Sequence, residues 1–123
     1  MSALPDLSNG NITVIGDVML DRFWSGVSRR VSPEAPVPVV NINGQDDRAG
    51  GAGNVAVNLA ELGVSVSLVG LCGDDDHARA LRACLEAAGV RWNVMPCAAD
   101  TIVKLRVLSR NQQLLRMDFE ETL

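Results

Sequence analysis

The 123-residue sequence has few cysteines and a single histidine, and both shortages exclude classes of site. Its three cysteines, Cys72, Cys84 and Cys97, are odd in number and widely separated, so they predict neither a disulfide framework nor a zinc site. We interpret them as small buried hydrophobic residues. His77 has no set of partner residues in the sequence that would make it catalytic or metal-binding.

Basic side chains are also scarce. The 11 Lys and Arg residues are outnumbered by 15 Asp and Glu residues, which gives a net charge of -4. A protein that binds nucleic acid through its phosphates needs a basic surface to replace the counterions, and the sequence contains no basic stripe. The composition therefore predicts no nucleic-acid partner.

Long apolar runs are absent as well. No stretch reaches the roughly 20 residues that span a bilayer, and the first residues lack the basic and apolar regions of a signal peptide. We therefore expect no membrane partner and a cytoplasmic location. The composition, 47% apolar and 21% charged, predicts one modest globular domain with a real core.

The most constrained stretch is the glycine-rich segment RAGGAGN at residues 48–54, which runs into the apolar segment VAVNLAELG. We predict a flexible loop and then a helix that opens near Gly53, with Val55, Leu59 and Leu62 on its buried face. Glycine lets backbone N–H groups approach a ligand, and a helix start offers unpaired donors, so the segment suits an oxygen-rich ligand. Equally, three glycines can simply make a tight connection before a buried helix.

Two carboxylates follow the first predicted strand. Residues 11–16, NITVIG, are short, β-branched and nearly all apolar, as in a buried parallel strand. Asp17 and Asp21 come just after it, where ligands of open α/β sheets commonly bind. A carboxylate accepts hydrogen bonds from two hydroxyls, so Asp21 is our candidate sugar ligand, whereas Asp17 suits a contact in the turn. The residues alone leave open that Asp21 is a cap or turn residue.

The segment at residues 22–48 interrupts the alternation of strands and helices. It contains the proline-rich run SPEAPVP at residues 32–38 and a short strand at residues 37–42, for which proline favours an edge position. We predict that the segment is an insertion. Its Arg29 and Arg30 are candidates for contacting a substrate phosphate, although two arginines in a loop are more often solvated.

The rest of the chain alternates again. A strand at residues 64–71 completes a β-α-β unit, and a helix opens at the acidic triplet of residues 74–76, which we interpret as helix capping. Strands at residues 90–95 and 101–108 follow, and the second returns through a hairpin at residues 109–119. In the second of these strands Val103, Leu105 and Val107 share one face, and the cations of Lys104 and Arg106 share the other with Ile102.

The glycine-rich segment belongs to a longer pattern of small residues, made of Gly50, Ala52, Asn54, Ala56, Gly63 and Gly73. This pattern resembles the first signature of the ribokinase, or PfkB, family of carbohydrate kinases. The resemblance implies an α/β, ribokinase-like three-layer fold of sheet and helices, with a small β lid at about residues 22–48 and 101–119. Residues 1–123 would then be the N-terminal part of a kinase domain.

The resemblance also implies roles for particular side chains. In ribokinase-like enzymes an aspartate a few residues after the first strand contacts the sugar, and Asp21 occupies that offset. The substrate-binding residues that the resemblance implies are Asp21, Gly50, Gly51, Asn54, Lys104 and Arg106. The last two would lie on the lid, where a cation can bind a phosphate or a hydroxyl group.

Three segments narrow the resemblance to one branch of the family. GDVMLDR at residues 16–22, SPEAPVPV at residues 32–39 and KLRVLSRNQQ at residues 104–113 are similar to bacterial D-glycero-β-D-manno-heptose 7-phosphate kinases, often the N-terminal half of bifunctional kinase/adenylyltransferases. This implies transfer of the γ-phosphate of ATP, with Mg²⁺, to the anomeric hydroxyl of the heptose, in ADP-heptose and lipopolysaccharide core biosynthesis. It also implies a homodimer formed through the lid.

The chain departs from the family in one respect. The catalytic Gly-Ala-Gly-Asp-type motif lies in the C-terminal half of the longer members, and it is not found here; GLCGD at residues 70–74 is only superficially similar. We therefore predict no catalytic, cofactor-binding or metal-binding residue in this chain, and binding of ATP and Mg²⁺ only by the complete kinase. Two alternatives stay open: a non-catalytic self-associating module, and another sugar or nucleoside kinase of the same superfamily.

Overall fold

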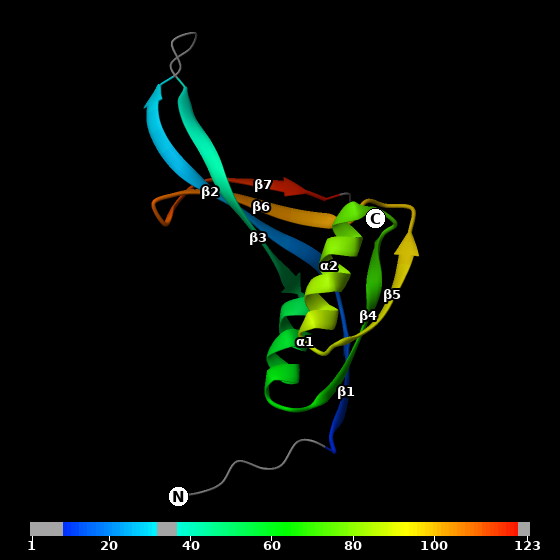
Figure 1. Ribbon diagram of the computed structural model, residues 1–123. Coiled ribbons are helices and arrows are strands. Elements are labelled where there is room, and N and C mark those ends of the chain that lie inside the picture. The colour runs from blue at the N-terminus through cyan, green and yellow to red at the C-terminus, as the bar shows by residue number, and fades with distance from the viewer. Residues whose placement is uncertain (1–8, 32–36, 121–123) are drawn as a thin grey trace, which may run out of the picture.

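The structure is a computed structural model that describes residues 9–31 and 37–120, and within them the chain forms two β-sheets and two helices. The elements are β1 (Asn11–Ile15), β2 (Val18–Val31), β3 (Pro38–Gly51), α1 (Ala52–Glu61), β4 (Ser65–Gly73), α2 (Asp76–Ala87), β5 (Arg91–Cys97), β6 (Ile102–Ser109) and β7 (Gln112–Phe119). One sheet has the strand order β1-β4-β5 and the other β3-β2-β6-β7. Figure 1 shows the long β2 and β3 strands extending well away from the helices.

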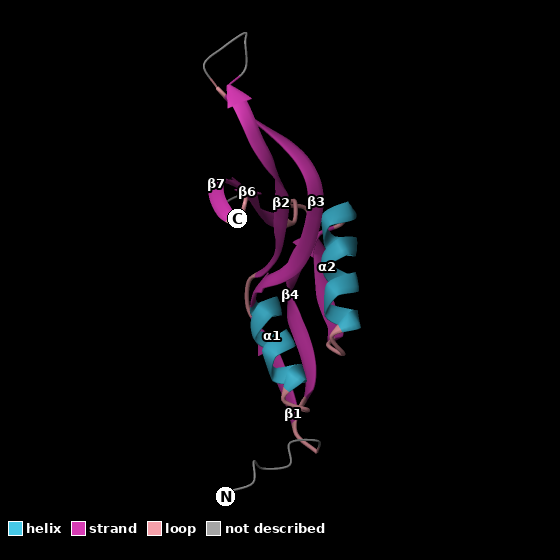
Figure 2. Ribbon diagram, turned by 60° about the vertical axis from the view of Figure 1, so that its left-hand side comes forward, coloured by secondary structure: helices cyan, strands magenta, loops and turns pink. Residues whose placement is uncertain are grey.

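The three-stranded sheet, which we call the core sheet, is parallel throughout. Both helices lie on one of its faces (Figure 2). Val66 and Leu68 of β4 are buried in the same apolar cluster as Leu81 and Leu85 of α2. This apolar contact is what the β-α-β pattern of the sequence predicts, and the α/β class is confirmed.

The four-stranded sheet, which we call the lid sheet, contains both segments expected to form a lid. In it β2 pairs in parallel with β6, while β3 and β7 pair antiparallel at the two edges. The predicted edge position of the proline-containing strand is therefore confirmed for β3. The base of the lid sheet is part of the core, because Val18 and Leu20 of β2 are fully buried.

The conformation of the glycine-rich segment differs from the flexible loop that the sequence predicts. Residues 48–51 are the end of strand β3 and not a loop, because they pair with β2, with Arg48 opposite Asp21. Asp21 likewise lies within a strand and not in a turn. The helix begins at Ala52, and its N-cap Gly51 has φ 57° and ψ -133°, a conformation that favours glycine.

The insertion is also more regular than predicted, since β2 and β3 each run for 14 residues. The side chains of Arg29 and Arg30 and the run at residues 32–36 lie outside the described residues, so their predicted roles remain predictions. None of the described helices has the length and apolar character needed to cross a bilayer.

Candidate functional site

The face of the lid sheet that points away from α2 carries most of the predicted substrate ligands, and we call it the site face. Successive residues of a strand alternate between faces, and paired residues on neighbouring strands share a face. The register places Asp21 of β2 between Arg48 of β3 and Lys104 of β6. Two residues further along, Phe23 lies beside Arg106. The structure therefore gathers charged side chains from three strands at one place.

Asp21 and Arg106 form an ion pair at the centre of the site face. Arg106 Nη1 lies 3.5 Å from Asp21 Oδ1, and the two side chains are only 22% and 23% exposed. This distance exceeds that of a normal hydrogen bond. Arg106 Nη1 is buried, and no described residue accepts a hydrogen bond from it. The pair thus holds a cationic donor that has no acceptor among the described residues, next to a carboxylate whose lone pairs can accept hydrogen bonds.

The ring of Phe23 lies beneath two guanidinium groups. The Cζ atom of Arg48 is 5.1 Å from the ring centroid, and that of Arg106 is 5.3 Å from it. Such cation–π contacts hold a guanidinium in place without using its N–H donors. Phe23 and Arg48 are site residues that the sequence patterns described above did not indicate. Phe23 is two residues from Asp21, and Arg48 is two residues from Gly50. These spacings could have indicated both residues, because residues two apart on a strand share a face.

Gly50 allows the Asp21 carboxylate to occupy its position. A Cβ atom at Gly50 would lie 2.7 Å from Asp21 Oδ1 and 2.9 Å from Met19 Cγ, closer than real Cβ atoms come. Gly51, the next residue, contributes through its backbone: its positive φ turns the chain into α1, where Ala52 N donates a 2.8 Å hydrogen bond to the carbonyl of Asp17. Both glycines are therefore required by close contacts at the base of the lid sheet.

Lys104 shares the site face but is already engaged. Its ammonium group donates hydrogen bonds to Glu120 at 2.9 Å and to Asp118 at 3.2 Å. These hydrogen bonds raise the pKa of Lys104 above its ordinary value. A substrate phosphate would have to compete with two carboxylates for this cation, whereas Arg106 has an unoccupied donor.

Asn54 lies apart from the other predicted ligands. It is exposed on the first turn of α1 and borders a groove of about 360 Å³, together with Asp47 and Arg48. The structure thus brings Asp21, Gly50 and Arg106 together and places Asn54 along a separate groove, to which Arg48 also contributes.

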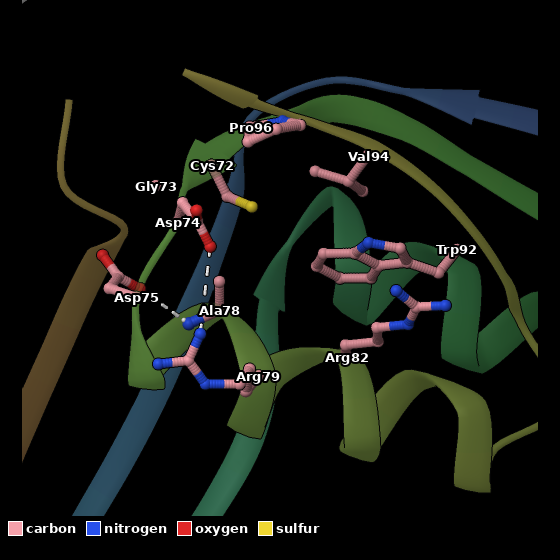
Figure 3. A pocket seen from close by; sticks show the side chains of 10 residues that line it. All are labelled: Cys72, Gly73, Asp74, Asp75, Ala78, Arg79, Arg82, Trp92, Val94 and Pro96. Atoms are coloured by element: carbon pink, nitrogen blue, oxygen red, sulfur yellow. Dashed lines mark hydrogen bonds and ion pairs between the residues drawn. The ribbon is translucent and has the colours of Figure 1, made fainter. Parts of the chain in front are cut away.

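A second hollow, of about 210 Å³, lies between α2 and β5 at the carboxyl end of the core sheet (Figure 3). Its charged side chains have partners: Arg79 forms ion pairs with Asp74 and Asp76, and Arg82 pairs with Glu86. Asp75, at its edge, accepts a 2.8 Å hydrogen bond from Ala78 N, which confirms the predicted capping. Within residues 9–31 and 37–120, no group of three or more His, Cys, Asp or Glu side chains could hold a metal ion.

Comparison with known proteins gives the same fold. A family described as "pfkB family carbohydrate kinase" matches residues 9–122. The chain is 56% identical over 121 residues to the "Bifunctional protein HldE" of Shewanella loihica, and 55% identical over 119 residues to that of Methylococcus capsulatus. These alignments cover 97% and 96% of the chain and 25% of each relative, so the chain spans about a quarter of their length.

Solved structures agree with this result. A carbohydrate kinase from Agrobacterium tumefaciens has a TM-score of 0.72 at 22% identity, over 89% of this chain and 35% of that one. Ribokinase from Cryptococcus neoformans, in complex with ADP, has a TM-score of 0.60 at 24% identity, over 90% and 35%. The predicted ribokinase-like fold is confirmed.

Proposed function

The chain belongs to the pfkB family of carbohydrate kinases, and from this premise we propose that it is the sugar-binding half of a kinase for D-glycero-β-D-manno-heptose 7-phosphate. The complete enzyme would transfer the γ-phosphate of ATP to the anomeric hydroxyl of the heptose, in ADP-heptose and lipopolysaccharide core biosynthesis in the cytoplasm. The identity of 54% to 56% with proteins named HldE supports this choice within the family.

The observation that carries the proposal is the ion pair between Asp21 and Arg106. Asp21 is held against Gly50 with lone pairs free to accept hydrogen bonds from sugar hydroxyls. Arg106 offers a buried donor for which the described part of the chain supplies no acceptor, and a guanidinium group binds phosphate well. A phosphorylated sugar supplies both hydroxyl donors for the carboxylate and anionic oxygens for the guanidinium.

The described residues supply one part of the reaction. Phosphoryl transfer needs a positioned nucleophile, a general base and stabilisation of the charge on the moving group. Asp21 and its neighbours would position the sugar hydroxyls. We assign ATP, Mg²⁺ and the general base to parts of the complete kinase outside this chain, which would be inactive by itself.

A calorimetric titration of this chain with heptose 7-phosphate, and with the same heptose lacking its phosphate, tests the proposal. We expect binding that depends on the phosphate and is abolished by Asp21→Ala. Asp74→Ala is the matched control, because Asp74 is an exposed carboxylate in the other hollow. Equal affinity for the heptose with and without its phosphate would point to another sugar or nucleoside kinase. If Asp21→Ala binds heptose 7-phosphate as tightly as the parent chain does, the assigned site is refuted.

A non-catalytic self-associating module is the second candidate. The face of the lid sheet opposite the site face exposes apolar side chains, with Leu115 52% and Phe119 54% exposed. Such side chains are suited to contact a second lid, and we propose that a homodimer forms there in either case. Sedimentation analysis that finds dimers without any sugar binding would favour the module over the kinase.

A further inference from the structure

Within the described residues the chain passes between the core sheet and the lid sheet at three places, and at one of these junctions hydrogen bonds from side chains join the ends of the elements. Gly16 N donates to the carbonyl of Val69 at 3.3 Å, and Ala52 N donates to the carbonyl of Asp17 at 2.8 Å. These two junctions, at the starts of β2 and α1, use backbone groups beside glycines. The third junction leads from β5 into β6, the strand that carries Arg106.

Asp75 makes that third junction with both of its carboxylate oxygens. Oδ2 accepts a 3.0 Å hydrogen bond from Thr101 N, and Oδ1 accepts a 2.7 Å hydrogen bond from Thr101 Oγ1. Oδ1 also accepts from Ala78 N at 2.8 Å, which caps α2. Thr101 Oγ1 in turn accepts a 3.0 Å hydrogen bond from Gly73 N at the end of β4. One carboxylate therefore ties together the ends of β4, α2 and β6.

Close contacts among Gly73, Asp75 and Thr101 restrict the backbone where β6 begins. Thr101 is 2% exposed, and it is the residue directly before β6. A Cβ atom at Gly73 would lie 2.5 Å from Asp75 Oδ2 and 2.7 Å from Thr101 N, so glycine is required for the close approach. Hydrogen bonds to an ionised carboxylate are stronger than those between neutral groups. The start of β6 is therefore fixed to the core sheet more firmly than a backbone connection alone would fix it.

We propose that Asp75 is a positioning residue for the substrate site: with Thr101 it holds β6 in place, so that Arg106 stands beside Asp21. Asp75 touches neither the substrate nor the reacting atoms in this proposal. Its effect on sugar binding rests on the proposed function, whereas its effect on the position of β6 does not.

Asp75→Asn separates this role from helix capping. The asparagine Oδ1 still accepts from Ala78 N and from the Thr101 hydroxyl, and asparagine is a good N-cap residue. Its Nδ2 group, however, is a donor and would face the donor Thr101 N. Asp76→Asn is the matched control, because Asp76 is the next residue and is exposed in its pair with Arg79. Thr101→Val removes the hydroxyl at similar volume, and Thr101→Ser restores it.

Amide hydrogen exchange measured by NMR on this chain is the first readout. We expect Asp75→Asn and Thr101→Val to speed the exchange of amides in β6 at least tenfold, with unchanged exchange in α2 and in β4 before Gly73, whose own N–H loses its acceptor in Thr101→Val. We expect Asp76→Asn and Thr101→Ser to exchange like the parent chain. The Arg106 Nε–H resonance is the second readout, because the ring of Phe23 shifts it, and we expect it to move in the first two variants only.

Unchanged β6 exchange together with an unchanged Arg106 resonance in Asp75→Asn would overturn the proposal. Faster exchange spread over α2 and the core sheet would also overturn the proposal, because such a result would show that Asp75 stabilises the whole fold and does not position β6 in particular. If the parent chain binds heptose 7-phosphate, Asp75→Asn should weaken binding about tenfold, and unchanged affinity would refute the positioning of the site. If the parent chain binds no sugar, the proposed function fails and the two NMR readouts decide the role of Asp75.

Discussion

The substitution Gly50→Ala tests the substrate site without removing any polar group. The added methyl group would lie 2.7 Å from Asp21 Oδ1, 2.9 Å from Asp21 Cγ and 2.9 Å from Met19 Cγ. Each distance is below normal contact, so the carboxylate must turn away from its position beside Arg106. The backbone at Gly50 does not have a positive φ, so alanine adds no conformational strain there.

The expected effect on sugar binding is at least as large as the effect on the free energy of unfolding. The methyl group displaces the ends of two rotatable side chains, and an off-rotamer side chain costs about 0.5–1.5 kcal/mol. A hydrogen bond to a charged group contributes about 1.5–3 kcal/mol. Loss of one such bond between Asp21 and a sugar hydroxyl would lower the affinity by about 10- to 150-fold, since about 1.4 kcal/mol corresponds to a factor of ten.

Calorimetric titration with heptose 7-phosphate and urea denaturation measure the two quantities on the same sample. Gly44→Ala is the matched control: it lies on the same strand, and its methyl group would also meet the end of a side chain, Ser25 Oγ at 2.7 Å. We expect Gly44→Ala to bind like the parent chain. If Gly50→Ala binds the sugar as tightly as Gly44→Ala does, the Asp21 carboxylate is not a sugar ligand in the geometry described.

Three further predictions concern the stability and reactivity of the fold. Leu81→Ala should lower the free energy of unfolding by about 2–5 kcal/mol in urea, because the side chain is fully buried in the core. Partial burial opposes ionisation of Asp75, but hydrogen bonds from Thr101 and Ala78 outweigh it and lower its pKa. The ionised form therefore stabilises the fold above about pH 4, which is the pKa of aspartate in the unfolded chain. This contribution to the free energy of unfolding should be lost as the pH falls from about 4 through the lower pKa that Asp75 has in the folded chain. Asp75→Asn should remove that part of the pH dependence, and an unaltered acid transition would contradict the assignment. Burial, and to a smaller extent the charge of Asp75, raises the pKa of the Cys72 thiol, so iodoacetamide should alkylate Cys72 at pH 7 far more slowly in the folded chain than in urea.

The two helices show how far local sequence patterns predict this fold. In α2 the helical spacing predicts the buried face, and Ala78, Leu81 and Leu85 are indeed buried. In α1 the prediction is wrong for Val55 and Leu62, which are 49% and 61% exposed.

The reason lies in the small residues of α1. Gly53 and Ala56 are its buried residues, and a Cβ atom at Gly53 would lie only 3.1 Å from the Cβ of Ala49. The helix therefore rests on its small residues, which allow close approach, while Val57 and Leu59 pack against the edge of the core and Val55 and Leu62 stay exposed. Periodicity identifies the apolar positions of a helix but not the distance at which the helix packs.

The residues of the proposed substrate site could be named from the sequence one by one, but their arrangement could not. The resemblance to ribokinase-like enzymes implies Asp21 at its offset from the first strand, and the alternation of residues 101–108 indicates Lys104 and Arg106. The pairing of β2 with β6 decides that Arg106 meets Asp21, and the return of β7 decides that Lys104 meets Asp118. Such pairings join residues far apart in the chain, and no local pattern in one sequence specifies their register.

The central position of β6 in the lid sheet has a consequence for folding. β2 can pair with β3 as soon as both are synthesised, but its other edge pairs with β6, in which Ile102 lies opposite Met19. Closing a loop of about 80 residues costs more entropy and takes longer than closing a hairpin. Until β6 arrives, a nascent chain exposes one full edge of β2, and an exposed edge can pair with the same edge of another chain. Aggregation during synthesis should therefore begin at this edge, and a chaperone that covers β2 would protect the chain until residues 102–109 have left the ribosome.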